Sequence, residues 1–217
     1  MIERDHSLTV EDDSMTIRVF DVGEITIDFN AAEVYNSWED YMRDVLDDDE
    51  DEEYIDLDAV GGNREFAPLS PIEVDELREL AIIESQHLHD IHEGHRTISD
   101  IHEAEEVVWE EDRAEPFMIL DVGVRTVVMA LLGIGAEPFS SCNAGCFEGD
   151  GHHAESYPHV AMYGPDDVLE LVENAARKHQ CGLYNAGGFG GQGALVLYAD
   201  DVRKFMAVAH DFFRFFG

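Results

Sequence analysis

The sequence predicts an α+β protein in which an antiparallel sheet is layered with helices. Three observations lead to this prediction. Over residues 117–217 the spacing of apolar residues indicates helices and strands in the order α-β-β-α-β-β-α. Before residue 117, alternating apolar and polar positions are followed by helical spacings. Residues 1–116 hold 37 acidic and 7 basic side chains, whereas the remainder holds 12 and 6. We therefore expect an acidic hairpin-and-helix unit over residues 1–115 and an α+β unit over residues 116–217.

The N-terminal unit is expected to begin with a β-hairpin. Residues 15–20 and 24–29 alternate apolar and polar positions around Asp21-Val22-Gly23, and a three-residue connection with glycine is typical of hairpins. Asn30 is then expected to cap a helix, because apolar residues recur after it at spacings of three and four. That apolar stripe consists of Val34, Tyr35, Trp38, Tyr41, Met42, Val45 and Leu46. We expect it to pack against the hairpin.

A strand at residues 54–60 and two more helices complete the predicted N-terminal unit. Ser70-Pro71-Ile72-Glu73 combines a capping box with a proline at the first helical position, which predicts a helix that ends near Gly94. Ser99 is expected to open the next helix, whose outer face carries several glutamates. These two helices are therefore predicted to present acidic faces.

The C-terminal unit is predicted to begin with a helix over residues 122–132. Asp121 is expected to cap this helix, and Gly133-Ile134-Gly135 ends it. A later helix, predicted to begin at Gly164-Pro165, has a proline, Asp166 and Asp167 in its first turn and Arg177 and Lys178 in its last turn. These charges complement the helix dipole. The remaining predicted elements are strands at residues 138–142, 159–163, 181–185 and 194–199 and a helix that begins at Asp200-Asp201.

The net charge excludes several function classes. The 217 residues include 13 Lys and Arg against 49 Asp and Glu, a formal net charge of −36. This chain cannot neutralise a row of phosphates, so we expect no direct nucleic-acid binding and no adsorption to an anionic membrane. No transmembrane or signal pattern is visible, and three cysteines form no disulfide framework, which predicts a cytoplasmic location. The sequence carries no signature of an oligomeric state.

The uneven charge suggests an acidic face that binds a basic protein partner, because complementary charge speeds encounter and selects partners. Our first hypothesis is therefore a non-enzymatic interaction protein, such as an inhibitor or immunity-like protein. The residues assigned to this face are Asp47, Asp48, Asp49, Glu50, Asp51, Glu52, Glu53, Glu103, Glu105, Glu106, Glu110 and Glu111. A salt-adapted, halophilic protein is an alternative explanation of the acidity, which 2 Lys against 11 Arg also fits.

Reactive side chains concentrate in and beside the loop between two predicted strands, at residues 143–158. Cysteine and histidine are preferred zinc ligands, and two cysteines with two of three histidines would complete a tetrahedral structural site. The candidate ligands are Cys142, Cys146, His152, His153 and His159. The sequence requires no cofactor, because a glycine-rich loop with cysteines buried for packing can fold without metal, and zinc is the alternative that these residue types allow. A zinc- or cysteine-dependent hydrolase is therefore the second hypothesis.

In the cysteine-dependent form of this hypothesis, Cys142 at a strand end is the nucleophile. His152 or His153 would act as its base, with Asp150 or Glu155 as the orienting acid. Residue types alone do not establish the geometry of a catalytic site, so the sequence assigns no catalytic residue.

The same region carries a resemblance to known sequences. Its pattern is Gly133-Ile134, then Phe139-Ser140-Ser141-Cys142-Asn143, a glycine-rich stretch with His152-His153, and Tyr157-Pro158-His159-Val160-Ala161. Over residues 120–165 this pattern resembles short uncharacterised bacterial and phage-associated proteins. The resemblance implies a shared fold element and no particular function.

Overall fold

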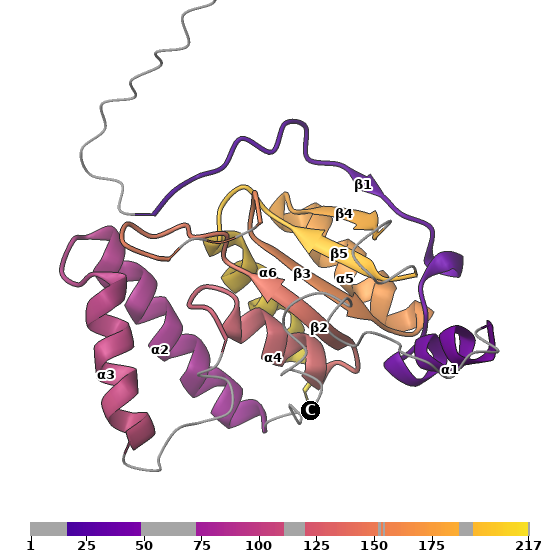
Figure 1. Ribbon diagram of the computed structural model, residues 1–217, viewed down its shortest axis with the longest axis horizontal. Coiled ribbons are helices and arrows are strands. Elements are labelled where there is room, and N and C mark those ends of the chain that lie inside the picture. The colour runs from indigo at the N-terminus through magenta and orange to yellow at the C-terminus, as the bar shows by residue number, and fades with distance from the viewer. Residues whose placement is uncertain are drawn as a thin grey trace, which may run out of the picture.

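The computed structural model describes residues 17–48, 73–110, 120–151, 153, 155–186 and 193–216. The helices are η1 (Ala31–Glu33), α1 (Trp38–Asp48), α2 (Val74–His92), α3 (Ile98–Glu110), α4 (Arg125–Gly133), α5 (Asp166–His179), α6 (Arg203–Phe212) and η4 (Phe213–Phe215). The strands are β1 (Ile27–Asp28), β2 (Glu137–Cys142), β3 (His159–Tyr163), β4 (Gly182–Asn185) and β5 (Leu195–Tyr198). Helices layered on this mostly antiparallel sheet confirm the predicted α+β class (Figure 1).

The five-stranded sheet has the order β1-β4-β5-β3-β2. Neighbouring strands are antiparallel except for β1 and β4, which are parallel. The register aligns four residues in one row across the sheet, in the order Cys142, His159, Tyr198 and Gly182. Because directly opposed residues project from the same face of a sheet, the side chains of Cys142 and His159 share a face.

Helices α4, α5 and α6 cover the opposite face of the sheet (Figure 1). Val160, Leu183 and Leu197 belong to the hydrophobic core on this side, as the alternation of strand side chains requires. Helix α2 packs on α4 and α6, and α3 lies beside α2 at one end of the molecule. The core therefore lies between the sheet and its helical layer.

A second, aromatic cluster lies on the other face of the sheet. Tyr41 stacks on Tyr163 with ring centroids 5.5 Å apart, and Phe139 stacks on the same ring at 4.7 Å. Trp38 contacts this group as well, at 6.0 Å from the Tyr163 ring. The described aromatic side chains of the predicted stripe, buried Tyr41 and half-buried Tyr35 and Trp38, therefore pack against the sheet and not against an N-terminal hairpin.

The predicted N-terminal hairpin is wrong over the residues that the structure describes. Ile17 forms an isolated bridge with Phe147, and β1 pairs with β4 of the sheet. The two alternating runs thus pair with distant segments and not with each other. Asn30 caps the short η1 turn, with its side chain accepting the Ala32 N–H, and α1 begins later, at Trp38.

A buried carboxylate from α2 holds the start of α4. Glu84, with 1% of its surface exposed, accepts the backbone N–H groups of Gly123, Arg125 and Thr126. The Arg125 side chain in turn donates to Glu105 of α3, with Nη2 and Oε2 2.9 Å apart. Glu84 thus satisfies backbone donors that a helix N-terminus leaves free. It replaces Asp121, which the sequence predicted as the cap, and α4 begins at Arg125 and not at residue 122.

Residues from both sides of the predicted boundary at 115/116 share one hydrophobic core. Leu77, Leu88 and Ile101 belong to the same buried cluster as Val128 and Phe205. The division into two units stays a prediction, but the two parts do not have separate cores within the described residues.

Among the residues that the structure describes, no helix combines the length and apolarity that membrane crossing needs.

Candidate metal centre

The chain turns sharply where β2 ends, and this turn presents Cys142. Ala144 and Gly145 follow with φ angles of 59° and 62°, in the left-handed region that non-glycine residues rarely adopt. The side chain of Asn143 supports the turn by accepting the Gly145 N–H at 2.9 Å. A Cβ at position 145 would lie 3.0 Å from the His153 ring, so glycine allows that ring to approach the turn closely.

Asp121, Cys142 and His153 bring one ligand atom each to within 4.8 Å of one another. Cys142 Sγ lies 3.1 Å from His153 Nδ1, and this nitrogen lies 3.8 Å from Asp121 Oδ2. Zinc–ligand bonds of about 2.0–2.3 Å in a tetrahedron place neighbouring ligand atoms about 3.3–3.6 Å apart. The two observed separations lie about 0.2 Å below and about 0.2 Å above this range. The three side chains are therefore a candidate donor set for a zinc ion, which would draw them to equal spacing.

Hydrogen bonds outside the donor set hold its members in place. His153 turns its other ring nitrogen, Nε2, toward Asp150, whose Oδ1 lies 3.5 Å away. Asn143, which is 2% exposed, donates its side-chain amide to Asp150 at 2.9 Å and its backbone N–H to Asp121 at 3.2 Å. A carboxylate behind a metal-binding histidine fixes the ring orientation in many metal sites. Asp150 and Asn143 are placed to serve this purpose.

The electrostatic surroundings of Cys142 are acidic. The pKa of its thiol is raised to about 12, mainly by burial and further by the Asp121 and Glu155 carboxylates. The Ala144 N–H, which donates to Sγ at 3.2 Å, has the opposite effect. Without a bound cation the sulfur is thus a protonated thiol at neutral pH. A divalent cation would compensate the carboxylates and favour the thiolate.

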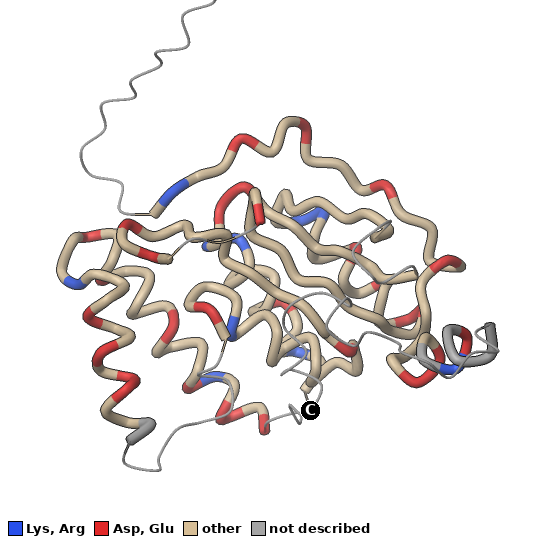
Figure 2. Tube along the Cα trace, in the orientation of Figure 1, with Lys and Arg blue, Asp and Glu red and all other residues tan. Residues whose placement is uncertain are grey.

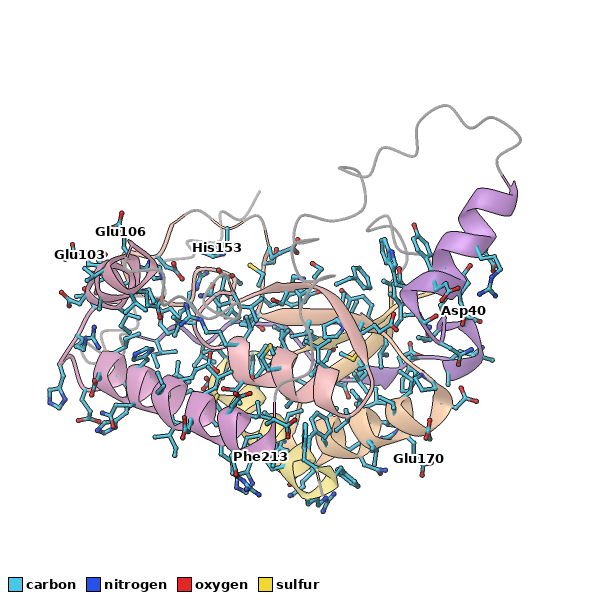
Figure 3. All side chains as sticks on the ribbon, turned by 90° about the horizontal axis from the view of Figure 1, so that it is seen from below. Asp40, Glu103, Glu106, His153, Glu170 and Phe213 are labelled. Carbon is cyan, nitrogen blue, oxygen red and sulfur yellow. The ribbon has the colours of Figure 1, made fainter. Side chains whose placement is uncertain are left out.

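The donor set lies on the side of the sheet that α5 and α6 leave free. Figure 3 shows His153 on this side, with Glu170 and Phe213 in the helical layer on the other. The side chain of His153 is 16% exposed and that of Asp121 is 33% exposed. Two of the three candidate ligands are therefore partly open to solvent.

The structure brings together two of the predicted zinc ligands, Cys142 and His153. Cys146 is buried in the hydrophobic core and does not join the donor set. His159 lies opposite Cys142 on β3, also outside the set, and His152 lies outside the described residues. Asp121 replaces them as the third donor. Sequence reasoning assigned Asp121 to a helix cap, and no spacing rule connects it to a cysteine 21 positions later.

The predicted acidic face is divided between distant parts of the molecule. Glu103 and Glu106 are exposed on α3, while Glu105 is bound to Arg125. The backbones of Asp47 and Asp48 end α1, and that of Glu110 ends α3. Helices α1 and α3 lie at opposite ends of the molecule (Figures 1 and 3). The other predicted members, Asp49, Glu50, Asp51, Glu52, Glu53 and Glu111, lie outside the described residues.

Comparisons of the chain with protein-family models, with curated proteins and with solved structures find no match. The resemblance over residues 120–165 and the cytoplasmic location therefore stay predictions.

Proposed function

We propose that the protein is a metal-dependent hydrolase whose zinc ion is held by Asp121, Cys142 and His153. The observation that carries this proposal is the convergence of three donor atoms of zinc-binding residue types to within 4.8 Å of one another. Hydrolytic zinc sites use three protein ligands and leave a fourth position for water, whose pKa the metal lowers to about 7. The partial exposure of His153 and Asp121 supports such an open position.

The metal-dependent form fits the site better than a cysteine nucleophile. Cys142, His153 and Asp150 do lie in the order of a nucleophile, a base and an orienting acid. A nucleophilic cysteine, however, needs surroundings that favour its thiolate. Burial, together with the carboxylates of Asp121 and Glu155, raises the pKa of the thiol instead. A bound cation reverses this effect, which favours the zinc-dependent mechanism.

Metal analysis of the purified chain tests the proposal. We expect about one zinc per chain in the wild type and less than a tenth of that in Cys142→Ser. Cys181→Ser is the matched control, because Cys181 is a buried cysteine outside the donor set. The zinc-loaded protein should hydrolyse p-nitrophenyl acetate, lose this activity with a chelator and regain it with zinc. Equal zinc content in Cys142→Ser and the wild type would refute the assignment.

A second proposed function, binding of a basic protein partner, now rests on α3. This helix carries Asp100, Glu103, Glu105, Glu106 and Glu110 and no Lys or Arg. Figure 2 shows acidic positions along its length, and Figure 3 shows Glu103 and Glu106 pointing outward. Such a helix attracts a basic surface through long-range charge. At low salt, a basic protein should co-purify with the wild type and should no longer co-purify when Glu103 and Glu106 are replaced with Gln. Unchanged co-purification would refute this surface.

A further inference from the structure

His159 is a buried polar residue next to the proposed centre. It begins β3 directly opposite Cys142, and Tyr198 opposes it on β5. The register places the side chains of His159 and Cys142 on the same face of the sheet. Only 9% of the His159 surface is exposed, and within the described residues its Nδ1 has no hydrogen-bond partner.

This arrangement has a cost that packing alone does not explain. A buried polar atom without a partner lowers the stability of the fold. Most buried nitrogens in proteins avoid this cost by a bond to protein or water. Burial lowers the pKa of His159, while Glu155, the Tyr157 backbone and Asp121 raise it in part, so both carboxylates lie within electrostatic reach of the ring. The ring of His159 thus lies in the same acidic surroundings as Cys142.

We propose that His159 is a further functional residue of the centre, whose Nδ1 hydrogen-bonds the water or substrate oxygen in the fourth metal position. This inference rests on the proposed zinc site. His159 does not join Asp121, Cys142 and His153 within 4.8 Å, whereas zinc ligands lie about 3.3–3.6 Å apart. It is therefore not a ligand of the proposed ion. A metal–oxygen bond of about 2 Å followed by a hydrogen bond of about 2.8 Å would connect the ion to a side chain beyond its ligands.

Acetohydroxamate, a small metal-binding molecule, probes the fourth position without any reaction. We would load wild type, His159→Phe and His159→Ala with zinc and measure zinc content and acetohydroxamate affinity by calorimetry. Both variants should retain about one zinc per chain and bind acetohydroxamate about tenfold more weakly, because one hydrogen bond is lost. His159→Gln, which keeps a polar group, should recover part of that loss. His210→Phe, an exposed histidine on α6, is the control and should match the wild type.

The possible results separate this inference from the proposed function. Absence of zinc from the wild type would overturn both. If zinc-loaded His159→Phe and His159→Ala bind acetohydroxamate as tightly as the wild type, the role of His159 is overturned and the proposed zinc site is not affected. Loss of zinc from folded variants, checked by circular dichroism, would make His159 a ligand and also overturn it. His159→Ala adds no bulk beside Tyr198, so it keeps the test valid if the phenylalanine prevents folding.

Discussion

The Glu84 carboxylate accepts the backbone N–H of Arg125 at 3.1 Å, with the acceptor on α2 and the donor at the start of α4. The same carboxylate accepts the N–H groups of Gly123 and Thr126 at 2.6 and 2.8 Å. Three charge-assisted bonds from one buried group are strong contacts between the two helices. They also fix the chain just after Asp121, which is a proposed zinc ligand.

Glu84→Ala should therefore destabilise the fold strongly. The substitution leaves three backbone donors without their acceptor, and we expect the free energy of unfolding to fall by about 3 kcal/mol. Chemical denaturation measures this change. Glu79→Ala removes an exposed acid from the same helix and should alter stability by less than about 0.5 kcal/mol. Equal effects of the two variants would contradict the capping role.

Asp150→Asn should weaken zinc binding without removing a ligand. Asp150 lies behind His153 Nε2, and loss of such a carboxylate lowers metal affinity by about tenfold or more. Competition with a chromogenic chelator measures the zinc affinity. Glu148→Gln removes an equal charge at an exposed position of the same loop. If both variants weaken binding equally, the effect is general electrostatics and not the orientation of His153.

The metal-free Cys142 thiol should react slowly with iodoacetamide at neutral pH. Its pKa is raised to about 12, and only the thiolate reacts. The alkylation rate at Cys142 should therefore rise about tenfold per pH unit from about pH 8 to about pH 10. A cysteine in a short peptide levels off over this range, because its pKa is about 8.5. Mass spectrometry assigns the modified residue, and a rate that is already constant at pH 7 would favour the nucleophile hypothesis.

Gly182→Ala should destabilise the sheet. A Cβ at this position would lie 2.0 Å from the Tyr198 ring, which occupies the space above the glycine. Tyr198 is 8% exposed and its hydroxyl accepts the Thr26 N–H, so the ring cannot move freely. We expect a loss of about 2 kcal/mol in thermal or chemical unfolding. Gly151→Ala meets no atom within 4 Å and should be close to neutral; a similar loss there would contradict the steric explanation.

Asp211 should make stability depend on acid pH. Burial opposes ionisation, but hydrogen bonds from Lys178 and His179 outweigh it and lower the pKa of Asp211 below 3.8. A carboxylate whose pKa is lowered by folding stabilises the fold at pH values above its pKa in the unfolded chain. It loses this contribution as the pH falls through its pKa in the folded protein. Asp211→Asn should therefore cost about 1 kcal/mol at pH 7 and less below about pH 3. Unfolding curves at both pH values test this; Glu170→Gln, at an exposed position, should show no such difference.

Local patterns in the sequence predict many of the elements. Strand β3 was expected at residues 159–163 and occurs there, because a short apolar run lies between Pro158 and Gly164. Helix α5 follows its predicted dipole pattern, with Asp166 and Asp167 in the first turn and basic residues in the last. In such segments, adjacent residues contain the information that selects the conformation. Cys142 and His153 were likewise recognisable as candidate metal ligands by residue type alone.

Long-range packing accounts for what these patterns missed. Strand β1 pairs with β4, whose partner residues are 156 positions away, and no turn signal specifies such a pairing. Asp121 meets Cys142 and His153 because Glu84 holds the start of α4 and Asn143 bonds to Asp121 across the loop. Residue type determines which side chains are able to bind a metal. The distances between these side chains depend on how helices and strands pack, and only the tertiary structure determines that arrangement.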